Sequence, residues 1–292
     1  MSLIFVVGTG RCGSSLVHEI LARHEDVGFI SNIDDLLPFL NFKGKWNNAL
    51  FRSPIGNFTR KGRARFAPSE AYRLISRQVS SSYANSVRDL RAEDVTPWLA
   101  ERYQLFFKER RSAQEKPIFI HKYTGWSRMS FFSRIFPQAK FVHVIRDGRA
   151  VANSWLQMEW WGGYRGPENW LWGPLEEMQE EEWESTGKSF VTLAGLGWNI
   201  LMESYRKAKE QVSTEHYYQM RYEDFVASPR EETEKLMEFI GLKWSTGFDK
   251  HYRAQPVYSD RRRGFESDLT KPQIAELEHT MGNWLREYGY IE

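Results

Sequence analysis

Five short apolar runs recur along the chain and alternate with segments whose apolar positions follow a helical period. The runs are rich in β-branched and aromatic residues and cover residues 3–7, 27–30, 118–121, 141–145 and 217–220. Such continuous apolar strands are typical of parallel sheets that helices cover on both faces. The pattern therefore predicts an α/β fold, with a parallel sheet of about five strands flanked by helices on both faces.

Helix start signals stand in front of three of the helical segments. Thr96 followed by Pro97 has the pattern of an N-cap and a first-turn proline, and predicts a helix that runs to about Arg111. Residues 228–231 and 270–273 both have the spacing of a capping box, in which the first side chain bonds the backbone of the fourth residue. Both boxes predict helices that begin at these points.

Two long segments, residues 32–68 and 159–188, show neither a strand period nor a helical one. The first contains prolines and basic residues, and the second contains glycine, proline, tryptophan and an acidic run. Because ordinary connections in compact domains are short, segments of this length are typical of binding loops or lids. No internal repeat or low-complexity linker interrupts the sequence, so we expect a single domain over residues 1–292 with both segments on its substrate side.

The composition is that of a soluble globular protein. Hydrophobic residues make up 41% and charged residues 27%, and 40 basic against 38 acidic side chains give a formal charge of +2. Because the basic residues are mostly interleaved with acidic ones, we expect no nucleic-acid partner. The longest apolar uncharged run, residues 190–202, is too short to span a bilayer, so we expect no transmembrane segment.

The N-terminal residues and the cysteine count favour a cytoplasmic protein. The first residues run directly into an apolar segment, with neither the basic region nor the cleavage site of a signal peptide. The single cysteine, Cys12, excludes an internal disulfide bond and a structural zinc cluster. We therefore expect a cytoplasmic location.

The first apolar run ends in a glycine loop that leads into a helical segment. Gly8 and Gly13 have the spacing of a Walker A loop, whose backbone N–H groups and helix N-terminus form a phosphate site. Ser14 stands where that motif has lysine, and Arg11 lies inside the loop, where its guanidinium can reach a phosphate. This loop is either a P-loop-like anion site or a tight strand-to-helix turn without a ligand. Cys12 fits structural filling better than nucleophilic catalysis, because the sequence identifies no base beside it.

A second candidate phosphate site follows the fourth apolar run. Arg146 stands at the end of that run, at the edge where open α/β sheets bind their ligands. Asp147 has the position of an N-cap for the next helical segment, and Ser154 lies two turns along it. Arg146 and Ser154 are therefore placed to hold a second phosphate together.

These motifs resemble those of the sulfotransferases that use 3′-phosphoadenosine 5′-phosphosulfate (PAPS). The sequence Arg-Cys-Gly-Ser-Ser at 11–15 matches their glycine loop except for the cysteine. Arg-Asp-Gly-Arg at 146–149, with Ser154 eight residues after its first arginine, matches their second signature with glycine in place of proline. A Tyr-Glu-Asp segment at 222–224 and a basic loop, Arg-Arg-Arg-Gly, at 261–264 follow in the order of the family. The resemblance covers nearly the whole chain.

The resemblance implies a PAPS-dependent sulfotransferase that requires no metal. The 5′-phosphosulfate would lie on the glycine loop, whose expected binding residues are Arg11, Cys12, Gly13, Ser14 and Ser15. Arg146 and Ser154 would select the 3′-phosphate, and Tyr222 would face the adenine. Arg263 and Gly264 would close over the 3′-phosphate. Cationic and backbone donors would stabilise the charge that grows on the leaving phosphate, as in phosphoryl transfer.

Sulfuryl transfer also requires a general base that takes the proton of the acceptor. Some relatives place a glutamate shortly after the first helix, where this chain has none, so Asp34 or Asp35 in the next turn is a candidate. Cytosolic relatives use a histidine two residues after a lysine, and here Lys122 matches the lysine while Thr124 holds the place of the histidine. His121 is a third candidate, although on a strand it points to the face opposite Lys122. We expect Lys122 to stabilise charge on the transferring group.

The acceptor is expected among small molecules, lipid-like alcohols and glycans. Tryptophans at positions 155, 160, 161, 170, 172 and 183 lie in or beside the second irregular segment. Part of this set is expected in the core and the rest in an apolar acceptor cleft. The basic residues between positions 52 and 65 are either a solvated loop or a site for an acidic or glycan acceptor. An enclosed apolar cleft favours a small or lipid-like alcohol over a large protein.

Two other functions fit parts of the sequence. A P-loop nucleotide kinase fits the glycine spacing, but the chain lacks the lysine that such an enzyme has at position 14. A catalytically inactive nucleotide-binding partner protein is the second alternative, and the intact spacing from Arg146 to Ser154 disfavours it. The leading hypothesis is a sulfotransferase that moves the sulfuryl group of PAPS to a hydroxyl-bearing acceptor.

Overall fold

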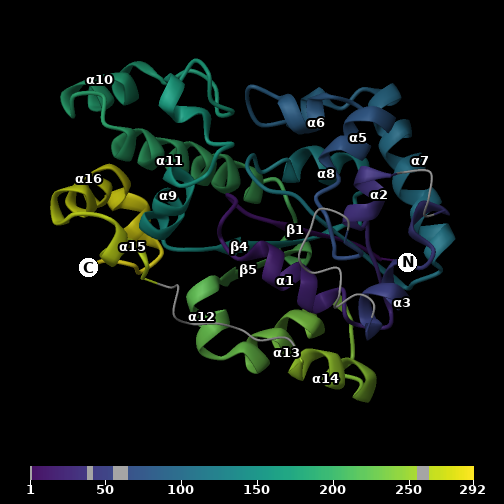
Figure 1. The fold of residues 1–292 in the computed structure, drawn as a ribbon. Helices are drawn as coiled ribbons and strands as arrows, with labels where there is room; N and C mark the ends of the chain where they lie inside the picture. The colour runs from purple at the N-terminus through teal and green to yellow at the C-terminus, as the bar shows by residue number, and fades with distance from the viewer. Residues whose placement is uncertain (1, 38–41, 55–64, 255–262) are drawn as a thin grey trace.

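A parallel β-sheet lies at the centre of the molecule (Figure 1). The computed structural model describes residues 2–37, 42–54, 65–254 and 263–292. The described strands are β1 (Ser2–Val7), β2 (Val27–Gly28), β3 (Ile118–Lys122), β4 (Lys140–Ile145) and β5 (Tyr217–Arg221). They pair in the order β2-β3-β1-β4-β5, and every pairing is parallel. The predicted α/β fold with a parallel sheet is confirmed.

The two faces of the sheet are covered by separate groups of helices (Figure 1). Leu3, Phe5 and Val7 of β1 point to one face, and Ile4 and Val6 point to the other. The face of Phe5 packs against α5 (Tyr72–Gln78), α7 (Pro97–Gln114), α8 (Met129–Ile135) and α11 (Phe190–Lys209). The face of Ile4 packs against α1 (Ser14–Leu21), α12 (Tyr222–Ala227), α13 (Pro229–Ile240) and α14 (Thr246–Arg253). Both sheet faces are therefore buried, as the continuous apolar strands predicted.

A third apolar cluster, rich in tryptophan, joins the C-terminal end of the chain to the rest. It contains residues of α9 (Gly148–Leu156), α10 (Glu177–Ser185), α11 and α16 (Lys271–Glu287). The short helices elsewhere are α2 (Asn32–Leu36), α3 (Asn47–Arg52), α6 (Ser82–Asn85) and α15 (Phe265–Asp268). The 3₁₀ turns are η1 (Phe42–Gly44), η2 (Ala92–Asp94), η3 (Gly162–Arg165) and η4 (Thr214–His216).

All three predicted helices begin where expected, and two of them have the predicted cap. The Thr96 side chain accepts from the backbone N–H of Leu99 at 3.2 Å, and the Thr270 capping box is present. The predicted box at Ser228 is wrong, because its side chain, which the structure describes, makes no capping hydrogen bond. Ser228 ends α12 and begins α13 at the same time. Its backbone (φ −132°, ψ 65°) lies between the two helices and does not take the usual N-cap geometry.

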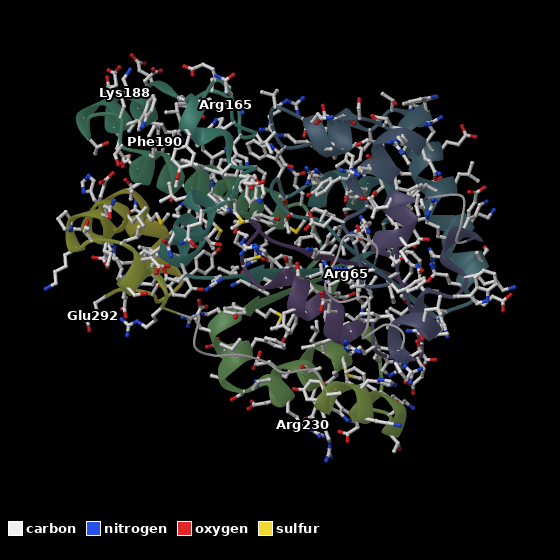
Figure 2. All side chains as sticks on the ribbon, viewed as in Figure 1. Arg65, Arg165, Lys188, Phe190, Arg230 and Glu292 are labelled. Atoms are coloured by element: carbon white, nitrogen blue, oxygen red, sulfur yellow. The ribbon has the colours of Figure 1, made fainter. Side chains whose placement is uncertain are left out.

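The two segments that showed no clear period contain short helices. In the first segment α2 begins at a capping box between Ser31 and Asp34, and in the second α10 begins at one between Glu176 and Gln179. A helix of two turns shows too few apolar repeats for its period to stand out in the sequence. Figure 2 shows Arg165, Lys188 and Phe190 of the second segment and its C-terminal flank at the outer surface near α10. The single-domain organisation stays a prediction.

No helix among the described residues is both long enough and apolar enough to cross a bilayer.

Candidate functional site

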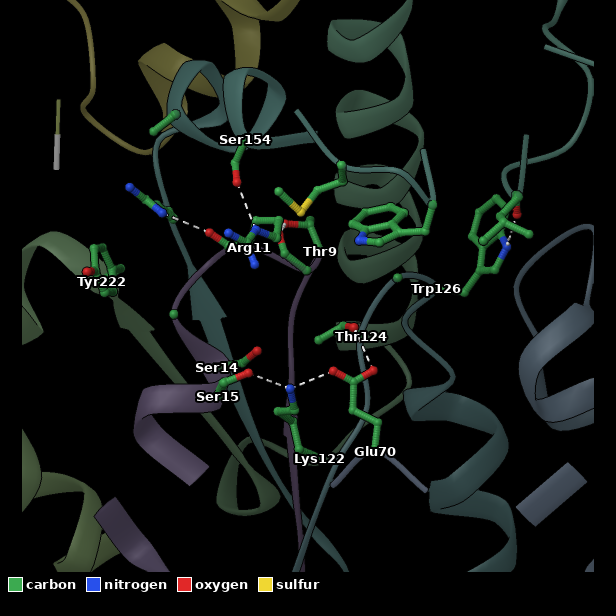
Figure 3. A pocket seen from close by; sticks show the side chains of 18 of the residues that line it. Thr9, Arg11, Ser14, Ser15, Glu70, Lys122, Thr124, Trp126, Ser154 and Tyr222 are labelled. Carbon is green, nitrogen blue, oxygen red and sulfur yellow. Dashed lines mark hydrogen bonds and ion pairs between the residues drawn. The ribbon is translucent and has the colours of Figure 1, made fainter. Parts of the chain in front are cut away.

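A cavity of about 1070 Å³ opens where the central strands end and the helices that follow them begin. The glycine loop after β1, the ends of β3 and β4 and the first turns of α1 and α9 all contribute to its wall. This is the carboxyl edge of a parallel sheet, where α/β proteins of this type bind ligands. Figure 3 shows the side chains that meet there.

The glycine loop has a backbone that only glycine tolerates at its last position. Gly13 has a φ of 93°, in the left-handed region, and α1 begins directly after it at Ser14. A Cβ atom on Gly13 would lie 2.2 Å from Cδ2 of the Tyr222 ring. The loop therefore packs closely against the Tyr222 ring at the point where α1 begins. Cys12 is fully buried beneath the loop, in a structural position.

Four residues predicted to bind the cofactor converge on one side of the cavity. Arg11 donates from Nε to the Ser154 hydroxyl at 2.8 Å, and Arg146 donates from Nη1 to the Arg11 carbonyl at 2.9 Å. The guanidinium of Arg146 lies 4.8 Å from the centre of the Tyr222 ring. Figure 3 shows Arg11, Ser154 and Tyr222 on the same side of the cavity. The structure brings together positions from the loop, the end of β4, α9 and α12.

Lys122 forms a second cluster with the loop and with an unpredicted carboxylate. Its Nζ atom donates to the Ser15 hydroxyl at 2.7 Å and lies 2.5 Å from Oε1 of Glu70. The Thr124 hydroxyl donates to the other carboxylate oxygen of Glu70 at 3.1 Å. Figure 3 shows Lys122 between Ser15 and Glu70, with Ser14 beside them. Burial alone would raise the pKa of the Glu70 carboxyl, but the charge and hydrogen bond of Lys122 outweigh it and lower that pKa.

The sequence contains no local sign of Glu70. It lies just before α5 and 52 positions from Lys122, so no spacing in the sequence connects the two residues. Only the fold brings this part of the chain to the end of β3.

The three residues predicted as alternatives for the base lie in other places. All three belong to the described chain, and none of them lines the cavity. Asp34 accepts from the Ser31 backbone at 2.7 Å and from the Asn47 side chain at 2.6 Å.

The other two candidates are also held by local contacts. Asp35 accepts from the backbone N–H of Leu74 at 2.8 Å. His121 is fully buried, with Nε2 at 2.8 Å from the Tyr83 hydroxyl, and burial lowers its pKa to about 3. All three side chains are therefore engaged by local contacts outside the cavity.

The basic loop near the C-terminus is described only at its end. Arg261 and Arg262 lie outside the described residues. Gly264 lines the cavity, whereas Arg263 extends away from the protein, with its side chain 74% exposed and paired with Glu266 at 2.5 Å.

Aromatic and aliphatic side chains line another part of the cavity, where Trp126 lies away from Arg11 and Tyr222 (Figure 3). They are Trp126, Met158, Trp160, Leu171 and Trp172. Trp126 donates from Nε1 to the carbonyl of Leu171 at 3.1 Å, which fixes the indole against this segment. Of the tryptophans considered from the sequence, those at 155, 161, 170, 172 and 183 are buried in the tryptophan-rich core. Trp172 also lines the cavity, as does the half-exposed Trp160.

The basic residues between 52 and 65 give little information about an acceptor. The positions at 60, 61 and 63 lie outside the described residues. Arg52 is paired with Glu25 at 3.3 Å.

The described part of the chain was also compared with the side-chain groups that bind metal ions. No group of three or more histidine, cysteine, aspartate or glutamate residues there has an arrangement that could hold a metal ion.

Comparison with known proteins gives matches along most of the sequence. The model of a family described as "Sulfotransferase family" matches residues 3–246. Omega-hydroxy-beta-dihydromenaquinone-9 sulfotransferase Stf3 of Mycobacterium bovis, and that of Mycobacterium tuberculosis, are each 23% identical over 193 residues. The match covers 64% of this chain and 43% of each relative, so the chain spans less than half the length of the curated relatives it matches.

Solved structures of other sulfotransferases share the fold. Sulfotransferase STF9 from Mycobacterium avium has a TM-score of 0.58 at 12% identity, and the likeness covers 97% of this chain and 76% of that one. The sulfotransferase domain of the Synechococcus PCC 7002 olefin synthase has a TM-score of 0.50 at 17% identity, over 96% of this chain and 94% of that domain. At these identities the likeness concerns the fold alone.

Proposed function

This chain belongs to the sulfotransferase family, and from that premise we propose that it moves the sulfuryl group of PAPS to a hydroxyl-bearing acceptor. The observation that carries the proposal is the convergence of Arg11, Arg146 and Ser154 at a glycine loop that has Ser14 in place of the Walker lysine. Two anionic groups on one nucleotide require two separate groups of donors, and the cavity has both.

The donor groups fit a phosphosulfate on the loop. Ser14, Ser15 and Lys122 surround the start of α1, where backbone N–H groups favour an anion. PAPS would supply an activated sulfuryl group and a phosphate leaving group. Lys122 and the loop would stabilise the negative charge on that phosphate, and this is the role proposed for Lys122.

The other group of donors fits the 3′-phosphate and the adenine. Arg146 and Ser154 would hold the phosphate, and Tyr222 would lie beside the adenine. In the free protein the guanidinium of Arg146 already contacts the Tyr222 ring. Arginine provides a planar fork of donors that suits a phosphate. Gly264 lines the cavity. Together with Arg263, its neighbour in the chain, it would close over the 3′-phosphate.

The apolar side of the cavity supports a small or lipid-like alcohol as the acceptor. Trp126, Trp160 and Leu171 line the same cavity as the ion pair of Lys122. The curated relatives are named for an ω-hydroxylated menaquinone, which is a lipid-like alcohol. An apolar enclosure would also keep water, a competing nucleophile, away from the transferring group.

Ligand-induced thermal stabilisation tests the choice of nucleotide. We expect adenosine 3′,5′-bisphosphate to raise the melting temperature of the protein, because a ligand that binds only the folded state stabilises it. ATP with Mg²⁺ is the control for a nucleotide kinase. A larger shift with ATP and Mg²⁺ than with the bisphosphate would reject the proposal.

A transfer assay then tests the donor and the acceptor class. PAPS is expected to support sulfation of dodecan-1-ol or 2-naphthol, whereas adenosine 5′-phosphosulfate is expected to be far poorer because it leaves the 3′-phosphate donors unpaired. Equal rates with the two donors would show that Arg146 and Ser154 do not select the 3′-phosphate. Faster transfer to heparan than to either alcohol would contradict the apolar acceptor.

A further inference from the structure

The ion pair between Glu70 and Lys122 lies inside the cavity at the point where the loop and the acceptor side meet. Glu70 reaches it from the chain before α5, and Lys122 from the end of β3. The Lys122 side chain is 8% exposed and the Glu70 side chain 22%, so the carboxylate is the more accessible partner. One ammonium group thus serves both the loop hydroxyl of Ser15 and the carboxylate.

An anion on the loop changes the surroundings of this carboxylate. Lys122 already donates to Ser15, so a phosphosulfate seated at the start of α1 would lie within reach of the same ammonium group. It would compete with Glu70 for Lys122, and its own negative charge would act on Glu70 as well. Both effects make the carboxylate hold a proton more firmly.

Resting on the proposed function, we infer that Glu70 takes the proton from the acceptor hydroxyl, and that Lys122 turns from Glu70 to the phosphosulfate when the donor is seated. The ion pair therefore makes the proton affinity of Glu70 depend on whether the donor is bound. Without PAPS, Lys122 bonds the Glu70 carboxylate. When PAPS is bound, Lys122 leaves the carboxylate, which is then free to accept the proton of the acceptor.

The transfer step balances with these two groups. The acceptor O–H bond breaks and its proton passes to the Glu70 carboxylate, while the acceptor oxygen forms a bond to sulfur. The bond between sulfur and the bridging oxygen breaks, and its electron pair stays on the 5′-phosphate, which faces Lys122. The products are a sulfate ester and adenosine 3′,5′-bisphosphate, and the proton on Glu70 passes to water.

The groups that surround Glu70 leave it able to act in this way. The titratable and charged side chains that bond it, interact with it or stand next to its partners are Lys122, Tyr72, Tyr83, His121 and Arg128. Burial raises the pKa of both tyrosines and lowers that of His121 to about 3, so all three are neutral at pH 7. Thr124 adds a neutral hydrogen bond. Lys122 is thus the cation that directly bonds the carboxylate.

Proton uptake on ligand binding tests the inference without catalysis. In the free protein the pKa of Glu70 is lowered, and a bound anion is expected to raise it. The complex therefore binds more protons than the free protein at pH values between the pKa of Glu70 in the free protein and its pKa in the complex. Calorimetry with adenosine 3′,5′-bisphosphate, at pH 5–6 in two buffers of different ionisation enthalpy, measures this uptake. We expect Glu70→Gln to take up fewer protons than the wild type.

A matched control separates this effect from the loss of any carboxylate. Glu25 also belongs to an ion pair, with Arg52, but it lies outside the cavity. Glu25→Gln is expected to take up as many protons as the wild type. Equal uptake by the wild type and Glu70→Gln would overturn the inference.

Turnover separates the inference from the proposed function. With PAPS and dodecan-1-ol or 2-naphthol, Glu70→Gln is expected to lower kcat by about 10²–10⁴-fold, the usual contribution of a general base. Its KM for PAPS should not rise, because Lys122 no longer bonds a carboxylate in the free protein, and the acidic limb of the kcat–pH profile should disappear. Wild-type kcat in Glu70→Gln would reject the base while the proposed function stands. A wild-type protein that binds no bisphosphate and transfers nothing from PAPS would instead reject the proposed function.

Discussion

Arg11 combines an uncommon backbone conformation with a long-range side-chain contact. Its φ of 57° lies in the left-handed region, which costs a non-glycine residue on the order of 1–2 kcal/mol. The side chain bonds Ser154 of α9, and the backbone carbonyl accepts from Arg146. The strained residue therefore stands between the loop and the second group of donors, so its replacement is expected to affect both.

Arg11 and Ser154 are expected to act on nucleotide binding as a unit. Arg11→Ala and Ser154→Ala should each weaken binding of adenosine 3′,5′-bisphosphate by about 10–100-fold, the loss of a hydrogen bond to a charged group. Because the two side chains bond each other, the double variant should lose about 0.5–3 kcal/mol less than the sum. Titration calorimetry on the four proteins measures the difference. Additive losses would mean that the contact does not persist in the complex.

Gly13 gives a second test at this scale. Gly13→Ala places a methyl group on the Tyr222 ring at a positive φ, so we expect bisphosphate binding to fall below detection. The neighbouring helix start must shift, and a loss of about 1–3 kcal/mol of unfolding free energy should follow from the strained backbone. Gly241→Ala is the control, since it also has a positive φ but stands at the end of α13. Retained binding in Gly13→Ala would show that the loop tolerates the shift.

Helix α9 connects the site to the C-terminal end of the chain through its first turn. The Asp147 carboxylate accepts from the Arg149 backbone at 2.9 Å and lies 2.8 Å from Nη2 of the Arg149 side chain. Arg149 also pairs with Glu278 of α16 and lies over the Phe265 ring. The second arginine of the signature therefore holds helices together, while the first one faces the cavity.

Removing the cap of α9 is expected to cost more than removing an exposed cap. Asp147→Ala should lower the free energy of unfolding by about 2–4 kcal/mol, because it removes a cap and leaves a largely buried arginine with one partner fewer. Thr270→Ala at the exposed start of α16 should cost about 1 kcal/mol. Urea unfolding with an unchanged m-value measures both. Equal losses would show that the arginine contributes nothing through Asp147.

Elements with strong local signals were predictable from the sequence. The continuous apolar strands and the caps at Thr96 and Thr270 depend on neighbours within a few residues, and they agree with the structure. Ser228 carries the same local pattern, but the preceding helix ends on it, and no local rule accounts for that. The glycine loop and Arg146 could be placed at one edge because parallel strands end there together. Glu70 could not be placed at this edge from the sequence, because only the tertiary fold brings it to Lys122.

The tryptophan-rich core and the apolar side of the cavity share a sequence segment but differ in burial. Trp155 is completely buried, whereas Trp160 lines the cavity and is 49% exposed. Trp155→Ala should cost about 3–5 kcal/mol of stability, as expected for a large core residue. Trp160→Ala should leave stability nearly unchanged and raise the KM for dodecan-1-ol. A higher KM for PAPS instead would place Trp160 on the nucleotide side.

The stability of the whole molecule is expected to depend on pH through Asp89. This carboxyl is 7% exposed, and burial raises its pKa to about 6, above that of the unfolded chain. A raised folded-state pKa favours the folded protein while the group is protonated, so this contribution falls as the pH rises from about 4 to about 6. Asp89→Asn keeps an acceptor for the Arg128 backbone N–H and should be more stable than the wild type at pH 7, by on the order of 1–3 kcal/mol. A constant difference between the two proteins from pH 4 to pH 7 would contradict this assignment.

The central position of β1 in the sheet determines when the site can first exist during synthesis. Its partners, β3 and β4, lie more than a hundred residues further along the chain. At the usual rates of translation the ribosome needs on the order of ten seconds to reach them. Contacts this distant in sequence also form slowly. The glycine loop is thus synthesised well before the strands that flank β1, and until those strands emerge β1 is an apolar strand without its partners in the sheet.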